Sequence, residues 1–76
     1  MDDPERVAAW KEVYAVLPHG WVVTSPQWRE GDHLWAIYAQ HVTDLRQGGG
    51  PWHGAFGQTE AVALRALAQQ FRNRRT

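Results

Sequence analysis

The four histidines are the residues best suited to bind a metal ion, because the chain contains no cysteine. His41 and His53 would face each other if the segments before and after the glycine run paired as a hairpin. A stable zinc site needs a third or fourth ligand, and Asp44 is the only nearby carboxylate. His33 lies roughly 27 Å from His41 along an extended strand, and His19 lies in a predicted turn. The sequence therefore predicts no metal site.

Catalytic groups are equally sparse. Ser25 is the only serine, and it precedes Pro26 with no nucleophile-elbow motif around it. Glu30 and Asp32 fall in a predicted hairpin tip, where solvent keeps both carboxylates ionised. The glycine run 48–50 lacks the Lys and Ser or Thr of a phosphate-binding loop. We therefore expect no enzyme activity, no catalytic residue and no cofactor.

Tryptophan and arginine are the remaining candidates for binding. Five tryptophans are more than one small core can cover, and exposed aromatic side chains are enriched at protein interfaces. The same side chains could instead cover the edges of the core. The C-terminal arginines could bind phosphates beside a base-stacking Trp, or they could simply complement the helix dipole. The candidate interaction residues are Trp28, Trp35, Trp52, Arg72, Arg74 and Arg75.

Charge and length narrow the function classes. Eight basic and eight acidic side chains cancel, so the chain lacks the positive charge that dominates nucleic-acid binding. No apolar run approaches the roughly 20 residues of a membrane span, and no signal-peptide pattern is present. We expect one domain over residues 1–76, without membrane association, in the cytoplasm.

Two segments have the amphipathic pattern of helices. The first is predicted from about Pro4 to Leu17, because Asp3 can cap its start and Pro18 cannot continue it. The second is predicted to begin after Thr59, and residues 72–76 are expected to fray. The predicted core face of the first helix carries Val7, Trp10, Val13, Tyr14 and Leu17, and that of the second carries Leu64, Leu67, Ala68 and Phe71. Of these, Trp10, Leu17, Leu64, Leu67 and Phe71 are expected to be the most buried.

The region between the helices has the pattern of strands. Trp21–Thr24 is β-branched and aromatic, and His33–Thr43 predicts a long strand without a polar face. Residues 29–32 predict the hairpin connection, and residues 47–51 a flexible loop. Trp52–Gly57 predicts a short third strand.

These elements predict an α+β fold: a helix, a two- or three-stranded antiparallel sheet and a helix, with both helices packed on the sheet. Packing on one face is the more economical layout, whereas packing on opposite faces would explain the apolar long strand. The one-face layout would leave Trp35 and Ile37, or else Leu34 and Tyr38, facing water. We expect a symmetric homodimer that covers such a patch, whereas the opposite-face layout predicts a monomer.

The order of helix, three strands and helix resembles the double-stranded RNA-binding domain. That family opens its second helix with a lysine-rich motif that grips phosphates. Here the corresponding residues are Thr59-Glu60-Ala61-Val62-Ala63-Leu64, an acid and apolar side chains. The resemblance therefore implies the shape of that domain and argues against its activity.

Two short runs resemble the small phage-associated "ABA sandwich" proteins, a family of unknown function. They are Val7-Ala8-Ala9-Trp10-Lys11-Glu12-Val13 and the run from Gly57 to Leu67. The resemblance implies a bacterial or phage-related cytoplasmic protein and no particular chemistry. We expect a non-catalytic binding or accessory module that acts through protein–protein contact. The alternative is a weak nucleic-acid binder that uses the C-terminal arginines and an exposed Trp.

Overall fold

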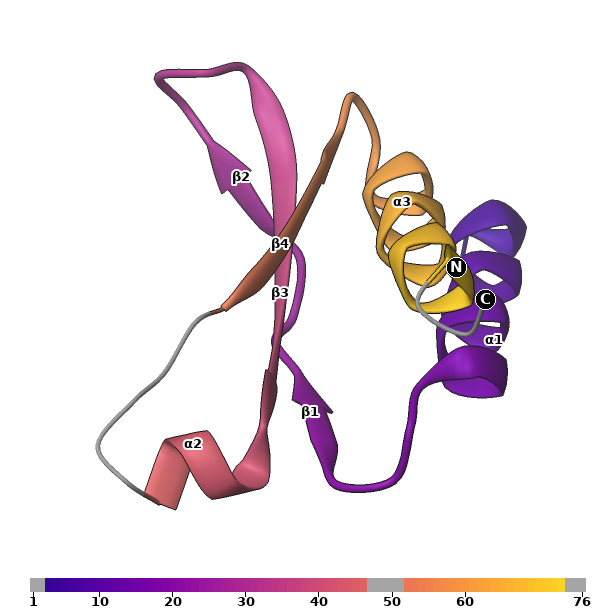
Figure 1. Ribbon diagram of the computed structural model, residues 1–76. Helices are drawn as coiled ribbons and strands as arrows, with labels where there is room; N and C mark the ends of the chain where they lie inside the picture. The colour runs from indigo at the N-terminus through magenta and orange to yellow at the C-terminus, as the bar shows by residue number, and fades with distance from the viewer. Residues whose placement is uncertain (1–2, 47–51, 74–76) are drawn as a thin grey trace.

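The computed structural model of the chain describes residues 3–46 and 52–73. Within these residues the chain forms a helix, an antiparallel sheet and a second long helix, with one short helix inserted between strands (Figure 1). The elements are α1 (Pro4–Val16), β1 (Trp21–Val23), β2 (Gln27–Arg29), β3 (Leu34–His41), α2 (Val42–Arg46), β4 (His53–Gly57) and α3 (Glu60–Asn73). The predicted α+β class and its order are therefore confirmed. The segment 47–51, predicted as a flexible loop, lies outside the described residues.

The central strand of the sheet is β3. Along one side it pairs antiparallel with β1 and then with β2, and along its other side it pairs antiparallel with β4. Val23 is opposite Ala39, but Gln27 is opposite Ala36, so the β1–β2 row contains one extra residue. Such an insertion is a β-bulge. The sheet thus has three rows, and the sequence did not predict that β2 would continue the first row.

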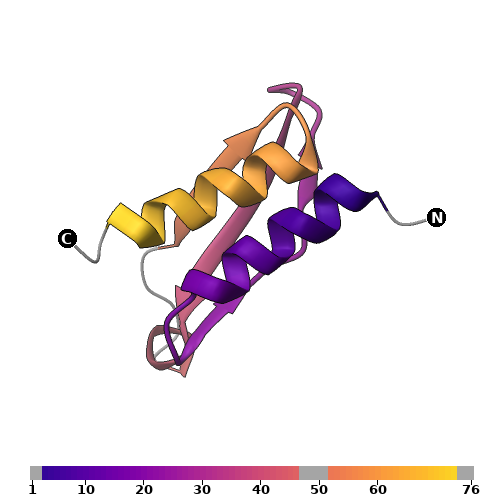
Figure 2. The ribbon, with the colours of Figure 1, turned by 90° about the vertical axis from the view of Figure 1, so that its right-hand side faces the viewer.

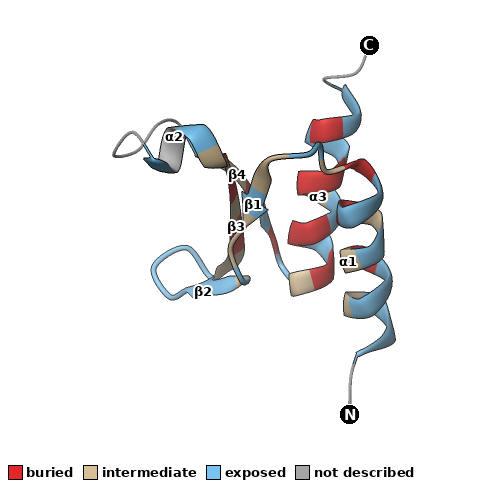
Figure 3. Ribbon diagram, turned by 90° about the horizontal axis from the view of Figure 1, so that it is seen from below, coloured by how far each residue is buried: buried red, intermediate tan, exposed pale blue. Residues whose placement is uncertain are grey.

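Both long helices cover the same face of this sheet (Figures 1 and 3). Helix α3 lies against β3 and β4, and α1 lies beside α3, running in the same direction (Figure 2). The one-face layout is therefore confirmed, and the opposite-face layout is wrong. The other face of the sheet is not covered by either long helix, and we call it the open face.

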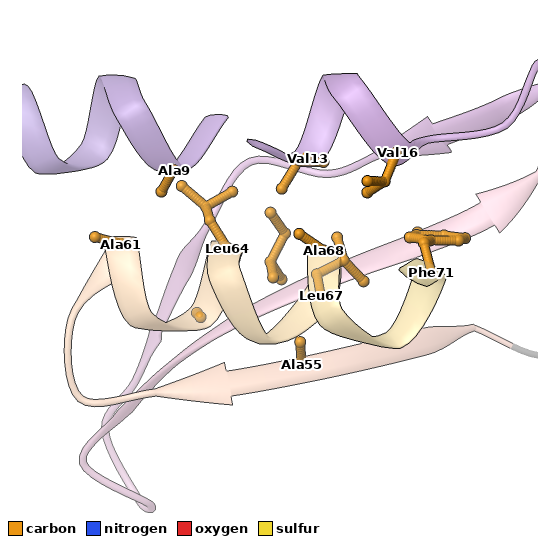
Figure 4. Close-up of a cluster of buried hydrophobic side chains, with 12 residues drawn as sticks. Ala9, Val13, Val16, Ala55, Ala61, Leu64, Leu67, Ala68 and Phe71 are labelled. Carbon is orange, nitrogen blue, oxygen red and sulfur yellow. The ribbon is translucent and has the colours of Figure 1, made fainter. Parts of the chain in front are cut away.

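The core lies between α1, α3 and the covered face of the sheet (Figure 4). Leu64, Leu67 and Phe71 of α3 are buried, as predicted, and Ile37 of β3 is fully buried beside them. Trp10 and Leu17 only pack partly buried against this cluster, so the prediction that they rank among the most buried residues is wrong.

The buried face of α1 differs from the predicted one. Ala9, Val13 and Val16 are buried, whereas Val7 and Tyr14 are 40% and 67% exposed. An alanine at the contact lets α1 approach α3 more closely than a face built on Trp10 would. Ion pairs between the two helices, described below, favour the same rotation of α1 about its axis, with Ala9, Val13 and Val16 facing the core.

The ends of the elements follow from local chemistry. Thr59 caps α3 as predicted, because its Oγ1 accepts a hydrogen bond from the Val62 backbone N–H at 3.1 Å. The long strand was predicted to reach Thr43 but ends at His41, where α2 begins. Here the His41 Nδ1 accepts the Thr43 backbone N–H at 3.2 Å, which removes that amide from strand pairing. At its C-terminal end α3 extends through Arg72 to Asn73, past the point where fraying was expected.

Candidate functional site

The open face carries the side chains of alternate residues of the sheet. Ile37 and Ala39 belong to the core, so Ala36, Tyr38 and Gln40 of β3 point to the opposite side. Directly paired residues share a face, which places Phe56 of β4 beside Ala36 on the open face. The sequence left two alternatives for the apolar side chains on the uncovered face. Leu34 and Tyr38 lie on that face, whereas Trp35 and Ile37 point to the helices.

Three aromatic side chains gather on the open face: Tyr38, Trp52 and Phe56, which we call the aromatic cluster. The Tyr38 ring centroid lies 6.4 Å from that of Trp52 and 6.2 Å from that of Phe56, both nearly perpendicular. This edge-to-face arrangement is favourable between aromatic rings. Trp52 is 46% exposed and Phe56 45% exposed, so the cluster presents a large apolar surface to water.

The central position of Tyr38 depends on a glycine. Gly54 is the residue of β4 directly opposite Tyr38, and a Cβ atom at Gly54 would lie 3.0 Å from the Tyr38 ring. The ring therefore lies across the neighbouring strand, over a glycine whose replacement would force the ring to shift. This places it between Trp52 and Phe56, which flank Gly54 in the chain.

Beside the cluster lies a groove of about 260 Å³ lined by Thr24, Tyr38 and Trp52. Thr24 is fixed at the bulge because its backbone N–H donates to the Tyr38 carbonyl at 2.9 Å. Its Oγ1 also accepts the Tyr38 backbone N–H at 3.2 Å. Pockets for drug-sized ligands and cofactors measure about 300–1,000 Å³. This groove is smaller, and its size suits one or two amino-acid side chains.

Arg29 provides the charged contact to the cluster. Its Nη1 donates to the Tyr38 hydroxyl oxygen at 3.0 Å, and its Nε lies 2.9 Å from the Asp32 Oδ2. The hydrogen bond to Tyr38 and the nearby Asp32 carboxylate raise the pKa of Arg29. The Tyr38 oxygen accepts from Arg29, so its own O–H hydrogen can be donated to a further acceptor.

The structure separates the three candidate tryptophans. Trp28 pairs with Trp35 across the strands, with ring centroids 5.7 Å apart, and Trp35 packs against the core. Both therefore lie on the helix-covered side of the sheet, whereas Trp52 contacts Tyr38 on the open face. The Trp28 indole N–H donates to the Glu30 carboxylate at 2.8 Å. The bulge causes this division, because without its extra residue Trp28 would pair with Leu34 and share the open face.

The candidate arginines are not brought to the aromatic cluster. Arg72 pairs with Glu12 of α1 at 3.5 Å, and Arg74 and Arg75 lie outside the described residues. Arg65 binds the carboxylates of Glu5 and Glu12 at 2.9 and 2.8 Å, and this contact lowers the pKa of Glu12. These ion pairs connect α1 to α3, so Arg65 and Arg72 stabilise the packing of the two helices.

His41 and His53, which would face each other in the hairpin considered from the sequence, are offset by two residues, because His53 is opposite Ala39. Both rings lie near Trp21. Ring centroids place His41 at 5.7 Å and His53 at 5.0 Å from Trp21. Across residues 3–46 and 52–73, no group of three or more potential metal ligands comes together. In that same part of the chain no helix is long and apolar enough to cross a membrane.

Sequence reasoning named Tyr38 only as one of two alternatives for the exposed patch, and it missed Phe56. The available signal was the combination of Tyr38 with Gly54, since an aromatic ring often lies over a glycine on a neighbouring strand. Reading it requires the β3–β4 register, which the sequence alone did not supply. Comparison with known proteins adds no further assignment: no family model, curated protein or solved structure matches this chain.

Proposed function

We propose that this chain is a non-catalytic, cytoplasmic protein-binding module whose contact surface is the aromatic cluster on the open face. The observation that carries this proposal is the exposure of Trp52 and Phe56 around Tyr38, on a face that the long helices leave uncovered. Tyr and Trp dominate the energetics of protein interfaces because they present large, rigid apolar areas with a polar tip.

Charge supports a protein partner over a nucleic acid. Nucleic-acid affinity rests on several Lys or Arg side chains that neutralise phosphates. On the described part of this chain, Arg29 pairs with Asp32, and Arg65 and Arg72 pair with acids of α1. The first turn of α3 carries Glu60, which binds Arg6 at 3.3 Å, where the RNA-binding domain has lysines.

Affinity capture from a lysate of the native host tests the proposal. We expect the immobilised chain to retain at least one protein at physiological salt, after nuclease treatment, and a Trp52→Ala and Phe56→Ala double variant to lose it. Tyr14→Ala is the matched control, because Tyr14 is an exposed aromatic residue on α1, away from the sheet. Retention that is equal in all three chains, or that nuclease abolishes, would refute the proposal.

A further inference from the structure

We propose that the occupant of the groove is a short, uncharged, proline-rich peptide segment in the polyproline II conformation. This inference rests on the proposed function, because it names the class of partner that the aromatic cluster binds. It follows from the size and rims of the open face, the state of the two sheet edges, the polar groups of the groove, and the charges around it.

The size of the open face argues against a second copy of the chain. Eight residues of β3 and three strand rows span roughly 27 by 15 Å, or about 400 Å². A specific protein–protein interface buries about 800 Å² on each partner, and at least about 500 Å². In addition, α2 and the β2–β3 turn both project on the open side (Figures 1 and 3). These rims hinder two flat faces from meeting, whereas an extended peptide can lie between them.

The sheet edges argue against a partner that adds a strand. Strand addition needs a row of outward backbone groups. On the β4 edge, the Gly54 carbonyl accepts a hydrogen bond from the Gln70 Nε2 at 2.8 Å. On the other edge, the bulge separates β1 from β2, and Pro26 lies there without a backbone N–H. A partner helix would need an apolar groove several turns long, whereas the described residues that line this groove are Thr24, Tyr38 and Trp52.

The groove has the polar groups that a proline-rich segment requires. Polyproline II has no internal hydrogen bonds, so its carbonyls need outside donors, while proline itself offers no N–H. The Tyr38 O–H can act as such a donor, because its oxygen already accepts a hydrogen bond from Arg29. Trp52, which also lines the groove, carries an indole N–H that is a donor only.

Perpendicular aromatic rings form the apolar part of the site. The Tyr38 and Trp52 rings meet at 81°, so with Thr24 they form a corner into which a prolyl ring can pack. Aromatic-lined grooves are the general means of recognising such segments, because the preformed helix loses little entropy on binding. Arg29 donates a hydrogen bond to the Tyr38 hydroxyl of the cluster, and Asp32 compensates its charge. The site therefore favours an uncharged ligand.

A titration with fluorescein-labelled decaproline tests the proposal, with fluorescence anisotropy as the readout. We expect Trp52→Ala to weaken binding about 30-fold, the effect of losing an interface anchor. We expect Tyr38→Phe to weaken it about two- to tenfold, the effect of one hydrogen bond. Circular dichroism of each variant checks that the fold is retained.

Matched controls make the result specific. Trp28→Ala removes a tryptophan of nearly equal exposure from the opposite side of the sheet, and Tyr14→Phe removes a hydroxyl from α1. Both should bind decaproline as the parent does. Absence of binding at millimolar peptide, or equal weakening by Trp28→Ala and Trp52→Ala, would overturn the proposal. Trp52-dependent binding of a decathymidylate in place of decaproline would overturn it in favour of single-stranded nucleic acid.

A random peptide library displayed on phage separates this inference from the proposed function. Enrichment of proline-rich sequences that bind the parent chain but not the Trp52→Ala variant supports both. Enrichment of Trp52-dependent sequences without proline overturns the inference and leaves the proposed function intact. If neither peptide binding nor protein capture depends on Trp52, both the proposed function and this inference are refuted.

Discussion

Leu67 provides the most direct test of how α3 is attached to the sheet. Its side chain is fully buried, and Figure 4 places it among Val13, Ala55 and Phe71. Truncation to alanine removes apolar contacts and leaves a cavity between helix and sheet. A change of Leu to Ala at such a site costs about 2–5 kcal/mol.

The size of the domain makes this cost large. At about 0.05–0.15 kcal/mol per residue, a chain of this length has a free energy of unfolding of about 4–11 kcal/mol. The Leu67→Ala variant should therefore lose between a fifth and all of its stability. With a urea dependence of about 1 kcal/mol per molar for a small protein, the midpoint should fall by about 2 M or more.

Urea titrations followed by Trp fluorescence and far-UV circular dichroism measure this shift. Val62→Ala is the matched control, because Val62 is an apolar residue of the same helix that is 48% exposed. We expect it to change the free energy of unfolding by about 0.5 kcal/mol or less. If Leu67→Ala costs no more than Val62→Ala, α3 is not packed on the sheet as described.

Further predictions concern a glycine, an acid and the histidines. A Cβ atom at Gly57 would lie 2.5 Å from a backbone nitrogen of α3, so Gly57→Ala should lower Tm by several degrees. Gly31→Ala, where a Cβ atom meets nothing within 4 Å, should leave Tm unchanged. Arg65 lowers the pKa of Glu12 from 4.5, so its carboxylate stabilises the fold above pH 4.5 and loses this effect as the pH falls through the lower folded pKa. Glu12→Gln should therefore flatten the loss of Tm below pH 4.5, and an unchanged slope would contradict this role. Zinc at about tenfold excess should not raise Tm; a rise abolished by His41→Ala would reveal a metal site.

The accuracy of the sequence-based predictions differs between the two long helices. The apolar residues of α3 form one stripe with polar residues opposite, so Leu64, Leu67 and Phe71 were predicted correctly as core. In α1 the apolar residues surround more of the helix, and the larger side chains Trp10 and Tyr14 favoured the wrong face. The buried face is set by Ala9 and by ion pairs to α3, which depend on a partner distant in sequence.

The candidate site was only partly predictable for a related reason. Trp28 and Trp52 were named as candidate interaction residues and both are exposed, but the two lie on opposite sides of the sheet. Their separation depends on one extra residue in the β1–β2 row, because a shift of one residue moves a strand's side chains to the other face. The sequence of residues 21–29 does not reveal this extra residue, because it becomes apparent only once the pairing with β3 is known. The membership of Tyr38 and Phe56 likewise depends on the register with β4.

The pairing of α1 with α3 has a consequence for the order in which the domain can fold. The hydrogen bonds from Arg65 to Glu12 and Glu5 join residues 53 and 60 positions apart, whereas neighbouring strands of the sheet are close in sequence. Contacts between distant segments form late, because closing the intervening chain costs entropy before any contact forms. As the chain is synthesised, α1 lacks its main packing partner until α3 has been made. A chain that ends at Gly57 would therefore lose α1 from the fold together with α3.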